Sequence, residues 1–303
     1  MLDLIIIGGG MAGMTAALYA LRNNKRVLII EKESVGGQIA KSPKVENYPT
    51  HKEISGSELA DQTFEQIMDL GVQFELEDVE SVEKINDIFK VKTNYNEYEA
   101  KAVIVATGAK PRTLGISNEE DYIGKGIFYC AICDGPFFAG EEVTLIGDAN
   151  SALQYALMLS GYCKQVHIIT LFDKFFGEQT LIDKVKSTPN IDIQHNLKAI
   201  ELTGGEKLES ITFERPDGST YIHKTKAAFV AIGFVPDNKI YEELADLDKA
   251  GYIVADEKCT TKTPGLFVAG DCRTKDIRQV ATAIADGAVA GTAATKYINS
   301  KEW

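Results

Sequence analysis

The sequence predicts an α/β fold with two three-layer domains, the second inserted in the first. Two stretches, 2–31 and 143–170, each show a buried strand, a tight turn, a helix and a second buried strand. Strands ending in glycine turns at 100–111 and 229–238 mark the crossings between the domains. The last segment, 263–298, has a strand, a turn with an acidic residue and a helix of small residues, so it returns to the first domain. The predicted limits are 1–113 and 238–303 for the first domain and 114–237 for the inserted domain.

The composition of the chain limits its class. Its 303 residues are 45% hydrophobic, which is enough for two medium domains with their own cores. The formal net charge of −12 argues against nucleic acid as a partner, because phosphate binding needs a basic face. No apolar stretch reaches the length of a membrane span, and Met1 leads directly into the strand-like Leu2–Ile7 without a basic region. We therefore expect a cytoplasmic protein that binds neither nucleic acid nor a membrane.

The first strand–turn–helix pattern contains the glycine spacing of a dinucleotide site. Gly8, Gly10 and Gly13 form a G-x-G-x-x-G turn between two β-runs, and Glu31 ends the second run. Such glycines allow a tight turn, close approach of a pyrophosphate and close helix–strand packing, so the helix N-terminus faces the anion. Glu31 is placed to accept hydrogen bonds from ribose hydroxyls. The pattern predicts a Rossmann-like nucleotide-binding domain; a glycine-rich turn in an ordinary α/β core is the alternative.

Two of the five cysteines, Cys130 and Cys133, form a C-x-x-C pair in the stretch CAIC. In a reducing compartment this pattern favours catalysis or metal binding over a structural disulfide. Zinc would usually need a second C-x-x-C or a close His pair, and the sequence has neither, so we predict redox chemistry and no metal site. Two sulfurs at this spacing can hold a reversible bond and release it by thiolate exchange.

Further motifs accompany these two. Five motifs follow the glycine turn in order along the chain: GGQI at 36–39, ENYP at 46–49, ATGA at 106–109, CAICDG at 130–135 and AGD…RQ at 269–279. Over essentially its whole length, the chain resembles the low-molecular-weight thioredoxin reductases. The resemblance implies a homodimeric flavoprotein whose first domain binds FAD and whose partner is thioredoxin. In ordinary members the second domain binds NADPH.

By position, the resemblance implies an FAD site made by Gly8, Gly10, Gly13, Glu31, Gly37, Gln38, Asn47, Thr107, Gly108, Asp271, Arg278, Gln279 and Val280. The first three glycines would hold the pyrophosphate and Glu31 the ribose, while Asp271 would approach the ribityl or phosphate part. The last three residues would lie near the pyrimidine edge of the flavin, where a helix start can stabilise anionic reduced flavin.

The resemblance also implies roles around the C-x-x-C pair. Cys133 would face the flavin, and Cys130 would attack the disulfide of thioredoxin. Asp134 is the candidate proton donor and acceptor, or alternatively a turn-forming residue before a glycine. The residues that follow belong either to the core or to the thioredoxin interface: Pro136, Phe137 and Phe138. A rotation of the domains is expected, with hinges near Lys110–Leu114 and Gly233–Asn238.

The second strand–turn–helix pattern departs from the family in two ways. Its turn, 147–152, carries Asp148 and Ala149, which put a charge and a methyl group where a pyrophosphate should approach the backbone. Ordinary members bind the 2′-phosphate of NADPH with one His and three Arg, whose positions are taken here by Thr170, Leu171, Phe172 and Phe176. A switch to NADH would explain the missing arginines alone. Both departures together favour loss of nicotinamide binding.

These departures resemble the ferredoxin-dependent flavin thioredoxin reductases of anaerobic, clostridial-type bacteria, the pyridine-nucleotide-independent branch of the family. The resemblance implies that reduced ferredoxin supplies electrons to FAD, which passes them to the disulfide. An NADH-dependent thioredoxin or disulfide reductase is the first alternative, and a non-enzymatic flavin or thiol redox sensor is the second. Ferredoxins are acidic, so docking needs a local basic surface. The candidates, unless they are ordinary solvated charges, are Lys41, Lys44, His51 and Lys52 in one group and Arg273 and Lys275 in another.

Overall fold

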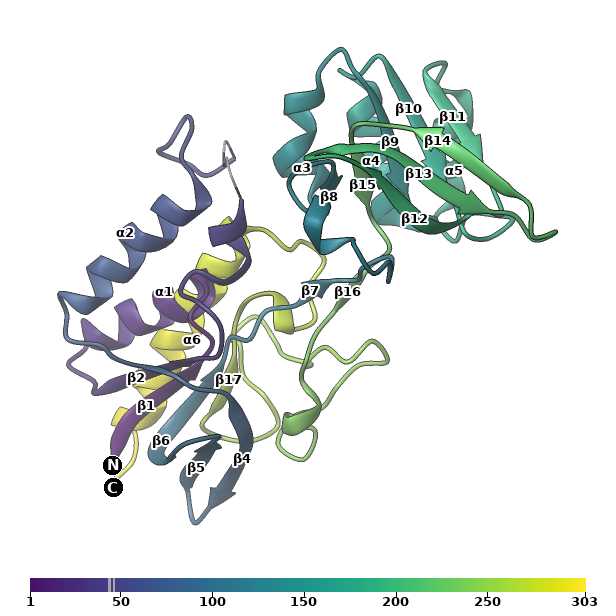
Figure 1. The fold of residues 1–303 in the computed structure, drawn as a ribbon. Coiled ribbons are helices and arrows are strands. Elements are labelled where there is room, and N and C mark those ends of the chain that lie inside the picture. The colour runs from purple at the N-terminus through teal and green to yellow at the C-terminus, as the bar shows by residue number, and fades with distance from the viewer. Residues whose placement is uncertain (43–44, 46) are drawn as a thin grey trace. The chain divides into compact units, whose positions relative to one another are not determined.

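The computed structural model describes residues 1–42, 45 and 47–303, which form two compact units (Figure 1). The first unit comprises Met1–Lys110 and Val235–Trp303, and the second is Pro111–Phe234. The chain therefore crosses between the units twice, at 110–111 and 234–235, three residues before each of the predicted domain limits at 113 and 237. The two crossing segments, β7 (Lys110–Pro111) and β16 (Phe234–Val235), pair with each other.

The first unit is built on a largely parallel sheet of order β3-β2-β1-β6-β5-β4, with β17 also pairing to β6. The parallel strands are β1 (Leu2–Ile7), β2 (Val27–Glu31), β3 (Gln73–Leu76), β6 (Glu97–Val105) and β17 (Leu266–Val268). An antiparallel hairpin of β4 (Val79–Ile85) and β5 (Ile88–Thr93) completes the sheet. β1 and β2 are almost continuously apolar because hydrophobic clusters cover both faces of the sheet.

The helices of the first unit are α1 (Met11–Leu21), α2 (Gly56–Met68) and α6 (Val280–Asn299), with the short helices η1 (Gly37–Lys41), η4 (Lys239–Tyr241) and η5 (Gly270–Cys272). α6 lies directly against α1 because glycines form the contact. A Cβ added at Gly287 would stand 2.3 Å from the carbonyl oxygen of Ala12, and one at Gly291 would stand 2.5 Å from that of Ala16. The small residues of α6 thus let two backbones approach each other beside the sheet.

The second unit has a parallel sheet of order β11-β10-β9-β15-β8 and a separate antiparallel sheet of order β12-β13-β14. The parallel strands are β8 (Ile127–Phe128), β9 (Glu142–Ile146), β10 (Gln165–Ile169), β11 (Ile191–Gln194) and β15 (Ala228–Val230). The antiparallel strands are β12 (Lys198–Gly204), β13 (Leu208–Glu214) and β14 (Thr220–Lys224). Together with the first unit, this arrangement confirms the predicted α/β fold class with parallel sheets.

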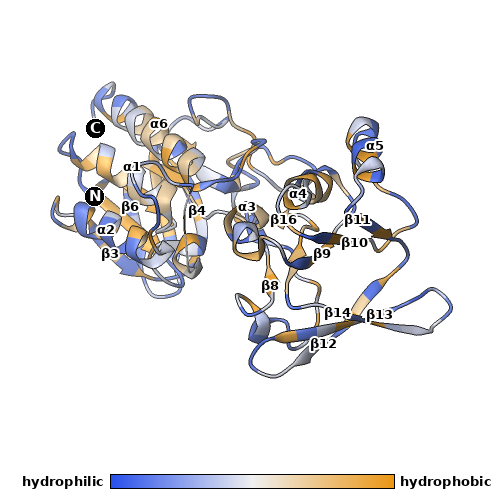
Figure 2. Ribbon diagram, turned by 90° about the horizontal axis from the view of Figure 1, so that it is seen from above, coloured by the Kyte–Doolittle hydropathy of each residue, from blue (hydrophilic) through white to orange (hydrophobic). Residues whose placement is uncertain are grey.

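The helices of the second unit are α3 (Ala131–Asp134), α4 (Asn150–Ser160) and α5 (Gln179–Ser187), with the short helices η2 (Glu120–Tyr122) and η3 (Gly135–Phe138). Figure 2 shows α4 as mainly hydrophobic, whereas α5 carries both hydrophilic and hydrophobic residues. Four residues of α4 are buried in the hydrophobic core of the unit: Ala152, Leu153, Ala156 and Leu159. None of the helices in the described part of the chain combines the length and the apolar character needed to cross a membrane.

Candidate functional site

The predicted nucleotide turn of the first unit is held by contacts that only glycine permits. Gly8 follows β1 with a φ of 111°, and an added Cβ there would stand 2.3 Å from the carbonyl oxygen of Ala106. A Cβ at Gly13 would stand 2.0 Å from the carbonyl oxygen of Gly8. Gly10 is the N-cap of α1, and no side chain caps that helix start. The N–H groups at the start of α1 therefore remain available to an anion.

The Glu31 carboxylate lies beside this turn. Its Oε2 accepts a hydrogen bond of 2.7 Å from the Gly9 N–H, and its Oε1 accepts one of 2.9 Å from the Glu33 N–H. Because a carboxylate oxygen can accept more than one hydrogen bond, both oxygens can still bind a hydroxyl. The two backbone donors fix the carboxylate at the end of β2.

Three further predicted residues make contacts within the first unit. Gly37, with a φ of 61°, approaches Gly10 so closely that an added Cβ would stand 3.6 Å from the Gly10 Cα. The Gln38 amide donates to the Ala109 carbonyl oxygen, and the Asn47 amide donates to Gln279 Oε1 over 3.1 Å. Segments separated by more than two hundred residues thus meet in one unit.

Thr107 and Gly108 follow β6 at the same edge of the sheet. Thr107 Oγ1 donates to Oδ1 of the buried Asn238 over 3.4 Å. Gly108 has a φ of 71°, and a Cβ added there would find no described atom within 4 Å. Gly108 is therefore required by the backbone conformation and faces open space.

Asp271, in η5, carries a buried oxygen that the described residues leave without a partner. Its Oδ1 has no hydrogen bond, and burial raises the pKa of its carboxyl to about 6, although the charges of Lys275 and Arg278 lower it. Such a group costs about 1–3 kcal/mol unless a ligand satisfies it. Arg278 donates to the Asp271 carbonyl oxygen over 3.4 Å and stacks on the Tyr252 ring at 4.0 Å. Gln279 caps the start of α6, and Val280 is the first residue of that helix.

Arg273 and Lys275 do not form the exposed basic patch that the sequence suggested for docking. Both reach the buried Asp286 carboxylate, over 2.8 Å each, and their side chains are only 12% and 8% exposed. Burial by itself raises the pKa of Asp286, but the hydrogen bonds from Arg273 and Lys275 outweigh burial and lower it. The same carboxylate accepts the Gly270 N–H over 3.0 Å, so the network fixes η5 beside Asp271. The sequence patterns did not single out Asp286 as a partner of these cations, although it is the only acidic residue in a helix of mainly small residues.

The second unit carries the predicted cysteine pair. Cys130 and Cys133 are joined by a disulfide, with their Cα atoms 5.3 Å apart. Cys130 is the N-cap of α3, and its sulfur accepts the Cys133 N–H over 3.2 Å. Both residues are partly exposed, whereas the three free cysteines of the chain are buried. A partly exposed disulfide at a helix start can undergo thiol exchange.

Asp134 ends α3 directly after Cys133. The residue is 8% exposed, and no hydrogen bond or ion pair to its side chain occurs among the described residues. Burial raises the pKa of its carboxyl to about 6. Gly135 has a right-handed helical backbone conformation, without a positive φ. Glycine is needed there because a larger side chain would not fit: an added Cβ would stand 2.3 Å from the Tyr162 hydroxyl. Asp134 and Gly135 therefore do not form a turn that needs the positive φ of glycine, and a proton-transfer role remains the prediction for Asp134.

The three residues after Gly135 divide between surface and core. Phe138 packs against Phe128 and Phe229, with ring centroids 5.2 and 5.8 Å apart. Pro136 and Phe137 are exposed. Ile132, between the two cysteines, is also an exposed apolar residue. Of the two alternatives left open by the sequence, Phe138 belongs to the core, whereas Phe137 lies on the surface and its interface role stays a prediction.

The second glycine turn precedes α4. Ala149 is the N-cap of that helix and no side chain caps it, while burial raises the pKa of the neighbouring Asp148 carboxyl. Asn150 Oδ1 accepts the Glu178 N–H over 2.7 Å, and its amide reaches a Glu178 carboxylate oxygen at 3.3 Å. Two carboxylates, those of Asp148 and Glu178, thus lie near this helix start, which disfavours a further anion there.

The positions of the expected phosphate clamp carry no cation. Thr170 is buried, and its hydroxyl bonds to the Phe172 carbonyl oxygen and to His195, both over 2.7 Å. Leu171, Phe172 and Phe176 are 52%, 48% and 55% exposed, and the two phenyl rings pack edge to face at 5.2 Å. Lys174 lies over the Phe176 ring at 5.6 Å. This surface is apolar where a nucleotide phosphate would need guanidinium groups.

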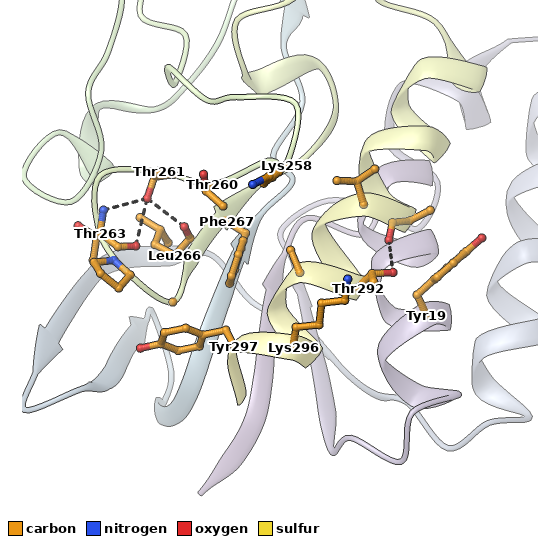
Figure 3. A pocket seen from close by; sticks show the side chains of 15 residues that line it. Tyr19, Lys258, Thr260, Thr261, Thr263, Leu266, Phe267, Thr292, Lys296 and Tyr297 are labelled. Carbon is orange, nitrogen blue, oxygen red and sulfur yellow. Dashed lines mark hydrogen bonds between the residues drawn. The ribbon is translucent and has the colours of Figure 1, made fainter. Parts of the chain in front are cut away.

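A separate cavity of about 770 Å³ lies on the first unit, beside α6 (Figure 3). Its lining includes Tyr19 from α1, Phe267 from β17 and Lys296 from α6, together with the threonines of the segment 260–263. None of the residues predicted for the FAD or thiol site lines it. It is therefore not a part of the candidate catalytic machinery.

A glycine-turn nucleotide unit joined to a second α/β unit with a C-x-x-C disulfide defines a disulfide oxidoreductase. The model of the pyridine nucleotide-disulphide oxidoreductase family matches residues 2–287, and the chain belongs to this family. Within it the chain is of the thioredoxin reductase type.

Relatives cover nearly the whole chain. A thioredoxin reductase of Listeria innocua is 38% identical over 298 residues, covering 98% of this chain and 93% of that protein. The 34.2 kDa protein in the rubredoxin operon of Clostridium pasteurianum is 37% identical over 302 residues, covering 99% and 98%. The crystal structure of thioredoxin reductase from Streptococcus pyogenes matches with a TM-score of 0.92 and 37% identity, covering 99% of each chain.

Proposed function

We propose that the protein reduces the disulfide of thioredoxin through FAD and the Cys130–Cys133 pair, with electrons from reduced ferredoxin rather than from NADPH. The observation that carries the choice of donor is the exposed apolar surface of Leu171, Phe172 and Phe176, at positions where the 2′-phosphate of NADPH needs cations. Family membership and the geometry of the thiol site support the rest of the proposal.

The residues of the first unit fit FAD. The turn at Gly8 and Gly13 leaves the start of α1 open to a pyrophosphate, and Glu31 is fixed beside it to accept ribose hydroxyls. The buried Asp271 Oδ1 without a partner suits a ligand hydroxyl. When bound, FAD supplies a carrier that accepts electrons singly or in pairs and passes a pair to a disulfide.

The thiol chemistry follows from the C-x-x-C geometry. In the reduced pair, the Cys130 thiolate attacks one sulfur of the thioredoxin disulfide, forming a mixed disulfide and releasing one thioredoxin thiolate. The Cys133 thiolate then attacks the Cys130 sulfur, which restores the internal disulfide and releases the second thiolate. Two electrons and two protons thus pass to thioredoxin. Asp134, with a pKa near 6, can hold the proton that a thiol loses and return it to a leaving thiolate.

The missing phosphate clamp has a large energetic consequence. Each charge-assisted contact from Arg to a phosphate contributes about 1.5–3 kcal/mol. Losing three of them would weaken NADPH binding by several orders of magnitude, even after a discount for non-additivity. Lys174 does not replace them, because its ammonium lies over the Phe176 ring. NADH lacks the 2′-phosphate and stays the alternative donor, but Asp148 and Glu178 disfavour its pyrophosphate as well.

A ferredoxin would dock on a local basic surface. Since Arg273 and Lys275 are paired with Asp286, we place the docking surface at His51 and Lys52. Lys52 is exposed, and both residues line a surface depression formed by the segment 47–52. Lys44 lies outside the described residues, and only the backbone of Lys41 is described. Lys52→Glu should raise the ferredoxin concentration for half-maximal rate several-fold, whereas the exposed Lys198→Glu of the second unit should not.

Anaerobic reduction of the flavin tests the donor. The flavin absorbance of the purified protein is followed during addition of reduced ferredoxin, NADPH or NADH, and thioredoxin reduction is measured in the same mixtures. We expect reduced ferredoxin to bleach the flavin and support thioredoxin reduction, and NADPH and NADH to do neither. Rapid bleaching by NADH at micromolar concentration would replace ferredoxin with the NADH alternative. Cys130→Ser and Cys133→Ser should abolish turnover and leave flavin bleaching by ferredoxin in place.

We further propose a homodimer, as family membership suggests. Tyr19 and Val289 both line the cavity beside α6 and expose 43% and 39% of their surface. Exposed apolar side chains that meet at one cavity suit burial against a second copy. The molar mass measured by light scattering tests this proposal.

A further inference from the structure

Glu119 is a buried carboxylate held by neutral donors from two different parts of the second unit. The residue is 3% exposed, and no ion pair to its side chain occurs in the described part of the chain. One oxygen accepts the Leu114 N–H over 2.9 Å and the Tyr129 hydroxyl over 2.6 Å, and the other accepts the Gly115 N–H over 3.0 Å. Three such hydrogen bonds offset the cost of burying the carboxylate.

The groups that donate to Glu119 come from two segments of the chain, one just after the crossing between the units and one just before the disulfide. Leu114 and Gly115 follow the crossing at Lys110–Pro111 by a few residues. Tyr129 directly precedes Cys130, the N-cap of α3. Burial and the hydrogen bond to Glu119 raise the pKa of Tyr129, so its hydroxyl remains a donor throughout the physiological range. One carboxylate therefore links the segment after the crossing to the residue before the disulfide.

The surrounding contacts make this link rigid. The Asn118 amide donates to the Leu202 carbonyl oxygen over 2.9 Å, and the Tyr122 hydroxyl donates to that of Gly204 over 3.0 Å. These bonds fasten the residues on either side of Glu119 to β12. Leu114 belongs to the range in which we predict a hinge, and its bond to Glu119 leaves conformational freedom only to the residues before it.

We propose that Glu119 is a positioning residue for the Cys130–Cys133 pair, acting through the Tyr129 hydroxyl. It holds the backbone of Cys130 in the conformation that the disulfide requires, and so favours the disulfide over the more mobile dithiol. The inference rests on the proposed thiol chemistry, and it extends that chemistry to a residue that contacts neither sulfur. Removing the link should make the disulfide easier to reduce.

The test measures the equilibrium between the pair and dithiothreitol. Dithiothreitol gives two electrons and two protons to the disulfide and becomes a cyclic disulfide itself. The full-length protein is equilibrated anaerobically at graded ratios of reduced to oxidised dithiothreitol and quenched with acid. It is then labelled with a maleimide under denaturing conditions, and the dithiol form takes two more labels than the disulfide form.

We expect Glu119→Gln and Tyr129→Phe each to raise the reduction equilibrium constant about three- to tenfold, a tenfold rise being about 30 mV for a two-electron couple. Tyr122→Phe is the matched control. It removes a hydroxyl with one hydrogen bond from the same region, but that bond leads to β12 and not to Cys130. Its equilibrium constant should equal that of the wild type.

Two results would overturn the inference. One is an unchanged equilibrium constant in Tyr129→Phe, which keeps the ring and should fold even if Glu119→Gln does not. The other is an equal change in Tyr122→Phe and Tyr129→Phe, because a general loss of stability would then explain both. The measurement uses dithiothreitol as the reductant and needs neither ferredoxin, a nicotinamide nor thioredoxin, so its outcome is independent of the ferredoxin proposal.

Discussion

Replacing Asp134 with Asn should stabilise the protein at neutral pH and slow its reaction. Burial raises the pKa of the Asp134 carboxyl from 3.8 to about 6. Each pH unit of that difference corresponds to about 1.4 kcal/mol, so the buried carboxylate costs the folded state about 3 kcal/mol at pH 7. The amide of Asn is also polar and buried, and a net gain of about 1–2 kcal/mol remains. At about 2–4 °C per kcal/mol, the unfolding temperature should rise by several degrees.

The pH dependence of this gain follows from the direction of the pKa change. Below pH 3.8 the carboxyl is protonated in both states, so the ionisation penalty is absent. As the pH rises from there to about 6, the unfolded chain ionises first, and the wild type loses stability relative to the Asn variant. Above the folded pKa the difference stays constant. The advantage of Asp134→Asn should therefore grow between about pH 4 and pH 6 and then level off.

Thermal unfolding of both proteins, followed by circular dichroism from about pH 4 to pH 8, measures this difference. Asp173→Asn, the same substitution at an exposed position of the same unit, is the control. Thioredoxin reduction by Asp134→Asn should fall about a hundredfold, the usual effect of losing an acid–base group. An advantage that is the same at every pH, or an Asn variant that is less stable at pH 7, would refute the reasoning.

Other predictions concern flavin retention, acid stability and assembly. Gly13→Ala should yield protein without FAD, because its Cβ would stand 2.0 Å from the Gly8 carbonyl oxygen, and the flavin absorbance per chain measures this loss. Gly205→Ala, where an added Cβ would meet no atom within 4 Å, is the control and should retain the flavin. Burial, with the charge of His167 adding to it, lowers the pKa of His223, so stability to urea should fall as the pH drops below about 6.5, and His223→Gln should flatten that fall. A pH-independent urea midpoint in the wild type would contradict this. Val289→Asp should halve the molar mass measured by light scattering, and an unchanged dimer would move the interface elsewhere.

Several features were predictable because their causes are local in the sequence. Apolar runs such as Leu2–Ile7 predict buried strands, and the spacing of Gly8 and Gly13 predicts a turn with no room for side chains. The two cysteines of CAIC are close enough in the chain to bond once α3 forms, with Cys130 at its N-cap and Cys133 inside it. The absence of arginine at the positions of Leu171 and Phe172 is likewise a property of the sequence alone.

The sequence by itself therefore determined the α/β fold class, the cysteine pair and the absence of arginine at positions 171 and 172. The tertiary structure decided which charges are free to act. Arg273 and Lys275 look like any solvated cations until Asp286, more than ten residues further on, pairs with both. Glu119 is indistinguishable from Glu120 in the sequence, yet it alone of the two is buried against Tyr129. Burial and pairing depend on residues that folding brings together from distant positions, and they set the free energy of each charge.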